Sequence, residues 1–203
     1  MNFTQNYSME YFTHNGGGKT QVRFLLRLKD YDISSWTSSQ GSFGIWLGVG
    51  FGKTVMDGSD IVHCQYAFSN NSAVDKFVCN DRYASGYQLP PLDSVRNTAD
   101  VNTNVVIKRQ VDGKFIATFE ATFDRPVNTG DIVQDKPILM SSMNNLIWAF
   151  GQLTNSNPTA HGTTSNDRGG LNNFFVIQLP SSAISLFKYS FLVAMIWSLY
   201  IAF

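Results

Sequence analysis

The sequence predicts an all-β domain, with antiparallel strands arranged as a sandwich or barrel. Its composition is rich in aromatic residues (14%, including 16 Phe) and contains 16 glycines, which suits half-buried strands joined by turns. Short runs of alternating apolar and polar residues recur at roughly 8 to 12 residue spacing, as in sandwiches and barrels. No long amphipathic helix pattern, heptad or internal repeat is present. At 203 residues, the chain is expected to form one domain.

Eight segments carry the strand pattern. In residues 22–29, Val22 and Phe24 alternate with Arg23 and Leu25, as in a half-buried strand. Asp112-Gly113 indicates a hairpin, because this pair favours two-residue turns. The expected strands are residues 22–29, 43–50, 61–68, 76–83, 105–111, 114–123, 147–151 and 173–179. Residues 155–170 are polar and lack periodicity, and loops of that length are usually functional or disordered.

The two cysteines point to a disulfide in a secreted protein. If residues 61–68 and 75–83 form a hairpin, Cys64 and Cys79 lie directly opposite each other, at a separation that a disulfide spans. The alternative is two buried thiols on the inward face. Sequons at Asn2 (NFT), Asn6 (NYS) and Asn70 (NNS) also favour a secreted, glycosylated protein.

The two ends of the chain suggest a membrane anchor and an incomplete start. Residues 179–203 form an apolar tail with small residues near Ser181, which resembles a signal for a GPI anchor. The alternatives are a plain membrane anchor, or the beginning of a larger membrane domain. The N-terminus shows no secretory signal, so we expect the natural start to lie further upstream. Residues 1–18, which end in three glycines, are expected to be flexible.

Charge and motifs exclude several classes of function. The 15 basic and 15 acidic residues balance, and the basic residues are spread along the chain, so no nucleic-acid surface is indicated. The sequence contains no nucleophile elbow, phosphate-binding loop, dinucleotide fingerprint or zinc-binding cysteine spacing. A catalytic constellation is therefore not predicted.

Met56 and His161 remain as candidate ligands. Met56 lies in a turn between Gly52 and Gly58, and His161 lies in the polar loop between small neighbours. Met with His is a standard axial pair for haem iron. The alternatives are a methionine that fills a gap and a histidine on a surface loop. Of the other histidines, His14 falls in the segment expected to be flexible, and His63 alternates with inward residues, so it should point outward.

Five stretches in order resemble a DOMON domain, and together they cover about residues 19–178. They are residues 45–62 (IWLGVGFGKTVMDGSDIV), 78–93 (VCNDRYASGYQLPPLD), 119–131 (FEATFDRPVNTGD), 146–152 (LIWAFGQ) and 161–170 (HGTTSNDRGG). The resemblance implies an immunoglobulin-like sandwich of two sheets. It is to the haem-binding branch, which includes the cytochrome portion of cellobiose dehydrogenase and the plant apoplastic b-type cytochromes.

In that branch, the resemblance implies that Met56 and His161 are the axial ligands of haem b. Trp46, Phe51 and Trp148 would surround the ring, and Arg168 would pair with a propionate. The implied function is electron transfer at the cell surface, because an iron capped on both faces leaves no open position for substrate.

The resemblance also suggests the partners of such a protein. The expected redox partner is ascorbate, a flavoprotein or a membrane cytochrome of the b561 type, with the C-terminal tail holding the protein at the membrane. The alternative is a haem-free DOMON module that binds a sugar, a catechol or a partner protein, since fold alone does not fix function.

Overall fold

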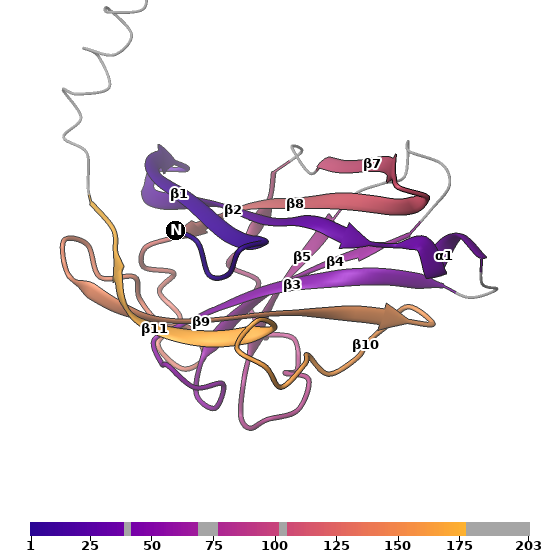
Figure 1. The fold of residues 1–203 in the computed structure, drawn as a ribbon. Helices are drawn as coiled ribbons and strands as arrows, with labels where there is room; N and C mark the ends of the chain where they lie inside the picture. Colours follow the sequence, from indigo (N-terminus) through magenta and orange to yellow (C-terminus); the bar gives the residue numbers. More distant parts are fainter. Residues whose placement is uncertain (39–41, 69–76, 102–104, 178–203) are drawn as a thin grey trace, which may run out of the picture.

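The computed structural model describes residues 1–38, 42–68, 77–101 and 105–177. They form two antiparallel sheets that lie one above the other as layers (Figure 1), which confirms the predicted β-sandwich. The first sheet has the order β1-β2-β8-β6, and β7 also pairs with β8. Its strands are β1 (Tyr7–Gly16), β2 (Lys19–Asp32), β6 (Ala99–Asp100), β7 (Val105–Val111) and β8 (Lys114–Pro126).

The second sheet has the order β10-β9-β3-β4-β5, and β11 also pairs with β9. Its strands are β3 (Phe43–Phe51), β4 (Asp60–Ala67), β5 (Phe77–Tyr83), β9 (Met143–Thr154), β10 (Asn157–Pro158) and β11 (Arg168–Phe175). A short helix, α1 (Ser34–Ser38), follows β2. β3, β4 and β5 match the expected strands to within one residue at each end. β9 extends past the expected residues 147–151 at both ends, and β11 begins inside residues 155–170, which were expected to form a loop.

The core fills the space between the sheets, as the two-residue period of each strand requires. Alternate side chains of β2 and β8, including Phe24 and Phe119, are fully buried and meet Leu47 and Tyr66 from the second sheet. The central strand β3 differs, because every residue from Gly44 to Phe51 is buried. A strand with one face in solvent would alternate, so the outer face of β3 must also be covered.

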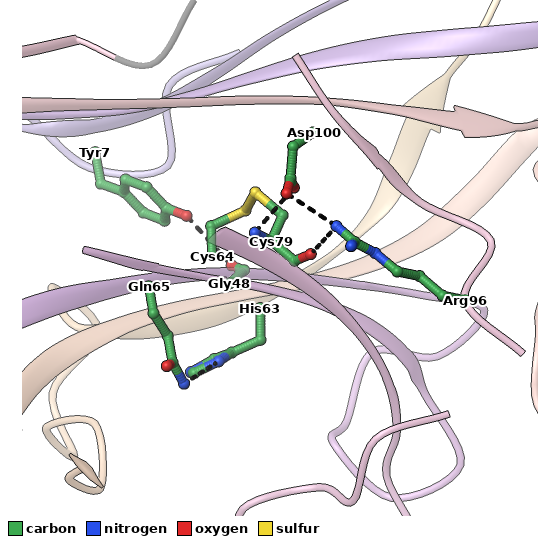
Figure 2. Close-up of a disulfide and its surroundings, with 8 residues drawn as sticks. All are labelled: Tyr7, Gly48, His63, Cys64, Gln65, Cys79, Arg96 and Asp100. Carbon is green, nitrogen blue, oxygen red and sulfur yellow. Dashed lines mark hydrogen bonds and ion pairs between the residues drawn. A yellow bond between two sulfur atoms is a disulfide. The ribbon is translucent and has the colours of Figure 1, made fainter. Parts of the chain in front are cut away.

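The β4–β5 hairpin has the register that the sequence predicted. Cys64 lies opposite Cys79, and the two form a disulfide in the core between the sheets. Figure 2 shows the disulfide on one face of this sheet, with His63 and Gln65 on the other. The tip of the hairpin, with Asn70, lies outside the described residues.

The N-terminal segment is part of the sandwich, so the prediction that residues 1–18 are flexible is wrong. Tyr7–Gly16 pair with β2 along their whole length. Tyr7 and Met9 are fully buried, and the Tyr7 hydroxyl donates a hydrogen bond to the Gly48 carbonyl over 3.3 Å. His14 is also ordered on β1, with Nε2 3.2 Å from an oxygen of Asp124.

Other sequence predictions concern the ends of the chain. Asn2 and Asn6 are exposed, as a glycosylation site must be, and their modification stays a prediction. The apolar tail at residues 179–203 lies outside the described residues. Within the described ranges, the chain contains no helix long and apolar enough to cross a membrane.

Candidate functional site

A cleft of about 700 Å³ covers the outer face of the second sheet. Its floor consists of strand residues that alternate with the core residues and therefore face away from the core. These are Trp46, Gly48 and Gly50 of β3, Ile61 and His63 of β4, and Ile147 and Ala149 of β9. The volume falls in the range of roughly 300–1,000 Å³ that is typical of small-molecule and cofactor sites.

Three loops wall the cleft and explain why β3 is buried on both faces. They contribute Thr54–Met56 after β3, Tyr87–Pro90 after β5, and residues 158–165 before β11. Figure 1 shows loops hanging below the second sheet, on the side away from β1, β2 and β8. The floor is largely apolar, and the loops supply the polar and sulfur-containing groups.

Met56 reaches the cleft from the tight turn between β3 and β4. The turn begins at Gly52 (φ +91) and closes at Gly58 (φ +76), both in the left-handed region that glycine adopts most readily. The Ser59 amide donates to the Met56 carbonyl over 3.0 Å, which fixes the turn. The Met56 side chain is half-buried and lines the cleft.

His161 reaches the same cleft from the loop before β11. Its Nδ1 lies 2.9 Å from the carbonyl oxygen of Gly162. Because a carbonyl only accepts, Nδ1 carries the proton and Nε2 keeps a free lone pair. Histidine ligands of metals usually have this arrangement, with the non-ligating nitrogen donating to a carbonyl or carboxylate.

Trp46 connects the His161 loop to the sheet. Its indole Nε1 donates to the Thr159 carbonyl over 3.0 Å, and its ring lies edge-on to the His161 ring at 6.2 Å between centroids. The indole also covers Gly151, where a Cβ would come within 2.7 Å of Nε1. Trp46 therefore lines the cleft, as expected, and also holds the loop that carries His161.

His63 is a residue of the cleft that sequence reasoning missed. It points outward as predicted, but outward on this sheet means into the cleft, where His63 is only 4% exposed. Its ring packs on Trp46 at 4.9 Å between centroids. Burial, reinforced by the charge of Arg82, lowers the pKa of His63 to about 3, so the ring is neutral. The burial of His63 comes from the loops that cover the sheet. The alternation of residues along the strands carries no information about those loops.

The two histidines of the cleft differ in which nitrogen is free. The Gln65 side-chain amide nitrogen lies 3.1 Å from His63 Nδ1 (Figure 2). An amide nitrogen only donates, so Nδ1 accepts and the proton of the neutral ring is on Nε2. That Nε2 is buried and has no hydrogen-bond partner within the described part of the chain. His63 thus offers a hydrogen-bond donor to the cleft, whereas His161 offers a lone pair.

The remaining predicted residues lie in different places. Arg168 is exposed on β11 and borders the cleft. Trp148 also borders it, but its ring stacks on Phe3 at 5.2 Å, away from the floor. The assignment of Phe51 to the cofactor site is wrong. Phe51 follows the inward phase of β3, and its buried ring packs at 5.3 Å from Phe24 in the core.

The lining of the cleft combines a largely apolar floor with two side chains of the types that bind haem iron. A thioether and an imidazole with a free Nε2 form a donor set for haem iron. The backbones of β11 and of the loop after β3 approach each other closely. A Cβ on Gly170 would lie 2.6 Å from the Thr54 carbonyl oxygen. Gly48 and Gly50 add no side chains of their own to the floor, and the neighbouring side chains of Trp46, Ile61 and Ile147 lie beside them.

The family model for the DOMON domain matches residues 29–151, more than half of the chain. The chain belongs to the DOMON family. The matched segment of this DOMON domain includes Met56 and the floor strands, and it ends before His161. The second ligand candidate therefore rests on the geometry of the cleft and not on the family match.

Comparison with individual proteins adds little about function. Among solved structures, the DOMON domain is similar to the cytochrome b domain of pyranose dehydrogenase from Coprinopsis cinerea. The identity is 15%, the TM-score is 0.42, and the match covers 82% of this chain and 71% of that one. A similarity of this size does not reveal what this DOMON domain binds. No curated protein matches the chain.

Proposed function

We propose that this DOMON domain is a b-type cytochrome domain that binds haem between Met56 and His161 and transfers electrons. One observation supports the proposal most strongly. Met56 and His161 come from distant parts of the sequence, and both line a single cleft. The floor of that cleft is apolar and its volume suits a cofactor.

The two side chains suit the two axial positions. His161 Nε2 has its lone pair free because Nδ1 is held by the Gly162 carbonyl. The Met56 thioether is a soft ligand that favours the reduced iron and raises the reduction potential. Bound haem would supply a one-electron redox centre, and with both positions filled by the protein no open site is left for substrate.

The rest of the cleft would tune the bound group. Trp46 and neutral His63 provide a packed, weakly polar wall, and a surrounding of low polarity is one of the properties that set a haem potential. His63 Nε2 would donate a hydrogen bond to an acceptor in the cleft. Arg168 at the rim would pair with a propionate, since guanidinium and carboxylate form strong charge-assisted hydrogen bonds.

The proposal also covers the redox partners and the cellular location of the protein. Ascorbate, a flavoprotein or a b561-type membrane cytochrome would exchange electrons with the domain. The buried Cys64–Cys79 disulfide supports an oxidising compartment, since disulfides are rare in the cytosol. We therefore propose an extracellular or cell-surface protein that the C-terminal tail anchors to the membrane.

Haemin titration of the purified protein tests the proposal. The expected result is one haem per chain, a low-spin absorption spectrum with sharp α and β peaks on reduction, and reduction by a mild donor such as ascorbate. A protein that stays colourless after haemin is added would reject the cytochrome. That outcome would favour the haem-free alternative, in which the same cleft binds a sugar, a catechol or a partner protein.

A further inference from the structure

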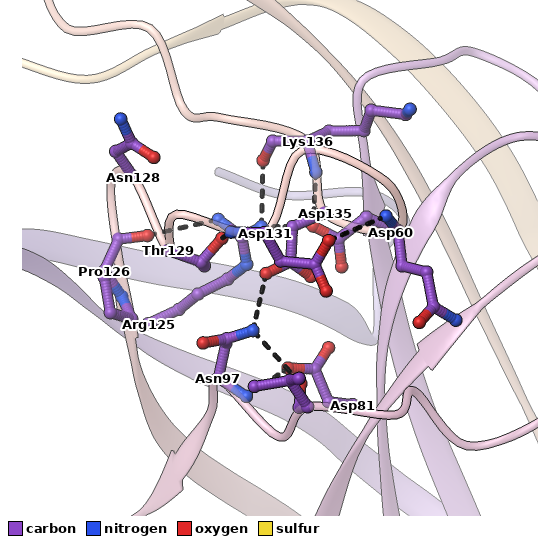
Figure 3. Close-up of polar contacts among 12 residues, drawn as sticks. Asp60, Asp81, Asn97, Arg125, Pro126, Asn128, Thr129, Asp131, Asp135 and Lys136 are labelled. Carbon is purple, nitrogen blue, oxygen red and sulfur yellow. Dashed lines mark hydrogen bonds and ion pairs between the residues drawn. The ribbon is translucent and has the colours of Figure 1, made fainter.

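Three buried carboxylates lie together outside the cleft, beside Arg125 and Asn97 (Figure 3). They belong to Asp60 at the start of β4, Asp81 in β5, and Asp135 in the segment after β8. Their exposed fractions are 0%, 2% and 3%. One carboxylate oxygen from each lies within 4.8 Å of the other two. None of the three residues lines the cleft.

Asp60 has one oxygen engaged and one left over. Its Oδ2 accepts the Lys136 backbone amide over 2.9 Å and also pairs with the fully buried Arg125 guanidinium. Its Oδ1 is buried and has no hydrogen-bond partner among the residues that the structure describes. The residue is thus held firmly from one side and keeps an unsatisfied oxygen.

Asp81 and Asp135 repeat this arrangement around Asn97. The Asn97 backbone amide donates to Asp81 Oδ2, and its side-chain amide donates to Asp135 Oδ2, both over 2.7 Å. In each aspartate Oδ1 is again buried and without a hydrogen-bond partner in the described ranges. Each of the three carboxylates therefore retains one oxygen without a hydrogen bond in the described ranges. This observation is independent of the short distances between the three groups.

The cluster holds more negative charge than the protein compensates. Arg125 pairs with Asp60, and the other two carboxylates receive only neutral donors among the described contacts, from Asn97 to both and from the Thr129 hydroxyl to Asp135. Burial, with repulsion from the neighbouring carboxylates, raises the pKa of Asp81 to about 7 and that of Asp60 to about 6. Buried charge without a partner is unfavourable, and proteins relieve it by pairing the charge, by metal coordination or by protonation.

We propose that Asp60, Asp81 and Asp135 bind a calcium ion. The donors are all carboxylate oxygens, which select hard cations over zinc or copper. Calcium takes oxygen ligands at about 2.3–2.6 Å, so ligand oxygens lie up to about 5 Å apart across the ion. The separations in the cluster are compatible with that size. Backbone carbonyls and water ordinarily complete such a coordination sphere.

Calcium binding to the full chain tests the site without reference to haem. The protein is first freed of metal with EDTA and then titrated with calcium chloride, by calorimetry and by thermal melting. We expect one binding event and a rise in Tm of roughly 3–6 °C at ten times the Kd, with a smaller response to magnesium at the same concentration. Asp81→Asn and Asp135→Asn remove ligand charge and should abolish the calcium response.

A matched variant controls for the loss of a carboxylate. Asp112→Asn makes the same chemical change at the exposed β7–β8 turn and should keep the full response. A wild-type protein whose Tm and heats do not respond to calcium would overturn the proposal, even if the cluster variants fail to fold. An unchanged response in both cluster variants, or an equal response to magnesium, would overturn it too.

Discussion

At the scale of single residues, the hydrogen-bond partner of each imidazole decides what that imidazole offers to the cleft. His161 Nδ1 faces a carbonyl, which leaves Nε2 with a lone pair. His63 Nδ1 faces an amide nitrogen, which puts the proton on Nε2. We therefore propose that His161 is a ligand and that His63 is a hydrogen-bond donor.

The burial of His63 makes a prediction about pH. The pKa of His63 is lowered to about 3 in the folded protein, against about 6.5 in an unfolded chain. As pH falls below about 6.5, the unfolded chain takes up a proton that the folded protein refuses, so stability is lost. His63→Gln removes this linkage. Relative to the variant, wild type should lose about 2 kcal/mol of unfolding free energy between pH 7 and pH 5.

Urea unfolding of both haem-free proteins at pH 7, 6 and 5 measures this difference. Comparison with the variant matters because the raised pKa values of Asp60 and Asp81 act in the opposite sense. Those two carboxyl groups bind protons more readily when folded, so they add stability as pH falls. If the difference between wild type and His63→Gln does not change with pH, His63 is not held neutral by burial.

Sequence patterns identified some of these residues and missed others for a physical reason. The resemblance selected Met56 and His161, and Trp46 lies in the outward phase of β3. Phe51 was assigned to the cofactor site as one of the aromatic residues that would surround the ring, but strand alternation turns it into the core. The acidic cluster has no sequence signature, since Asp60, Asp81 and Asp135 meet only after the strands pair.

At the scale of elements, the pairing of β3 with β9 positions Trp46, which in turn holds the loop that contains His161. Trp46 of β3 lies directly opposite Gly151 of β9. The absence of a side chain at Gly151 lets the indole lie flat there and reach the Thr159 carbonyl. Trp46 thus holds the loop by a hydrogen bond, and the missing side chain at Gly151 makes room for its indole.

Gly151→Ala should detach that loop. The new Cβ would fall 2.7 to 2.8 Å from the Trp46 ring, closer than carbon atoms tolerate, so the indole must move. We expect a loss of about 1–3 kcal/mol in unfolding free energy, the usual effect of overpacking. Tryptic cleavage after Arg168 should become faster. Chemical unfolding and limited proteolysis measure these two effects.

Gly48→Ala is the matched control for that prediction. It adds the same methyl group on the same face of the sheet, where the nearest atom would be 3.4 Å away, an ordinary contact. Ala is also less costly than Gly in a strand, so stability should be kept or slightly raised. Equal effects of the two substitutions would show that Trp46 packing on Gly151 does not hold the loop.

The strands themselves were largely predictable, and the exceptions have identifiable causes. Asp112-Gly113 forms the expected turn, with φ of +48 and +78, and the cysteine register is as predicted. β1 was missed because the three glycines at the end of residues 1–18 suggested flexibility. Its strand is fixed by burial of Tyr7 and Met9 against the sheet, a tertiary effect that local propensity does not contain.

At the scale of the whole molecule, the sandwich separates two environments on the two faces of one sheet. The inner face holds the disulfide and the aromatic core, and the outer face carries the cleft. Composition and strand spacing predicted an all-β sandwich or barrel, and the resemblance to DOMON domains implied the sandwich of two sheets. The cleft did not, because it depends on three loops that are far apart in the sequence and meet only in the folded domain.

The central proposal is that Met56 and His161 are the two axial ligands of one haem. The visible spectrum and reduction potential of the haem-loaded protein test it most directly, in wild type, Met56→Ala and His161→Ala. Each substitution should abolish the low-spin spectrum, and loss of the thioether should also lower the potential. Met143→Ala, at an exposed residue outside the cleft, and His63→Gln should keep the low-spin spectrum. A wild-type spectrum in both Met56→Ala and His161→Ala, or its loss in His63→Gln with retention in His161→Ala, would contradict the account.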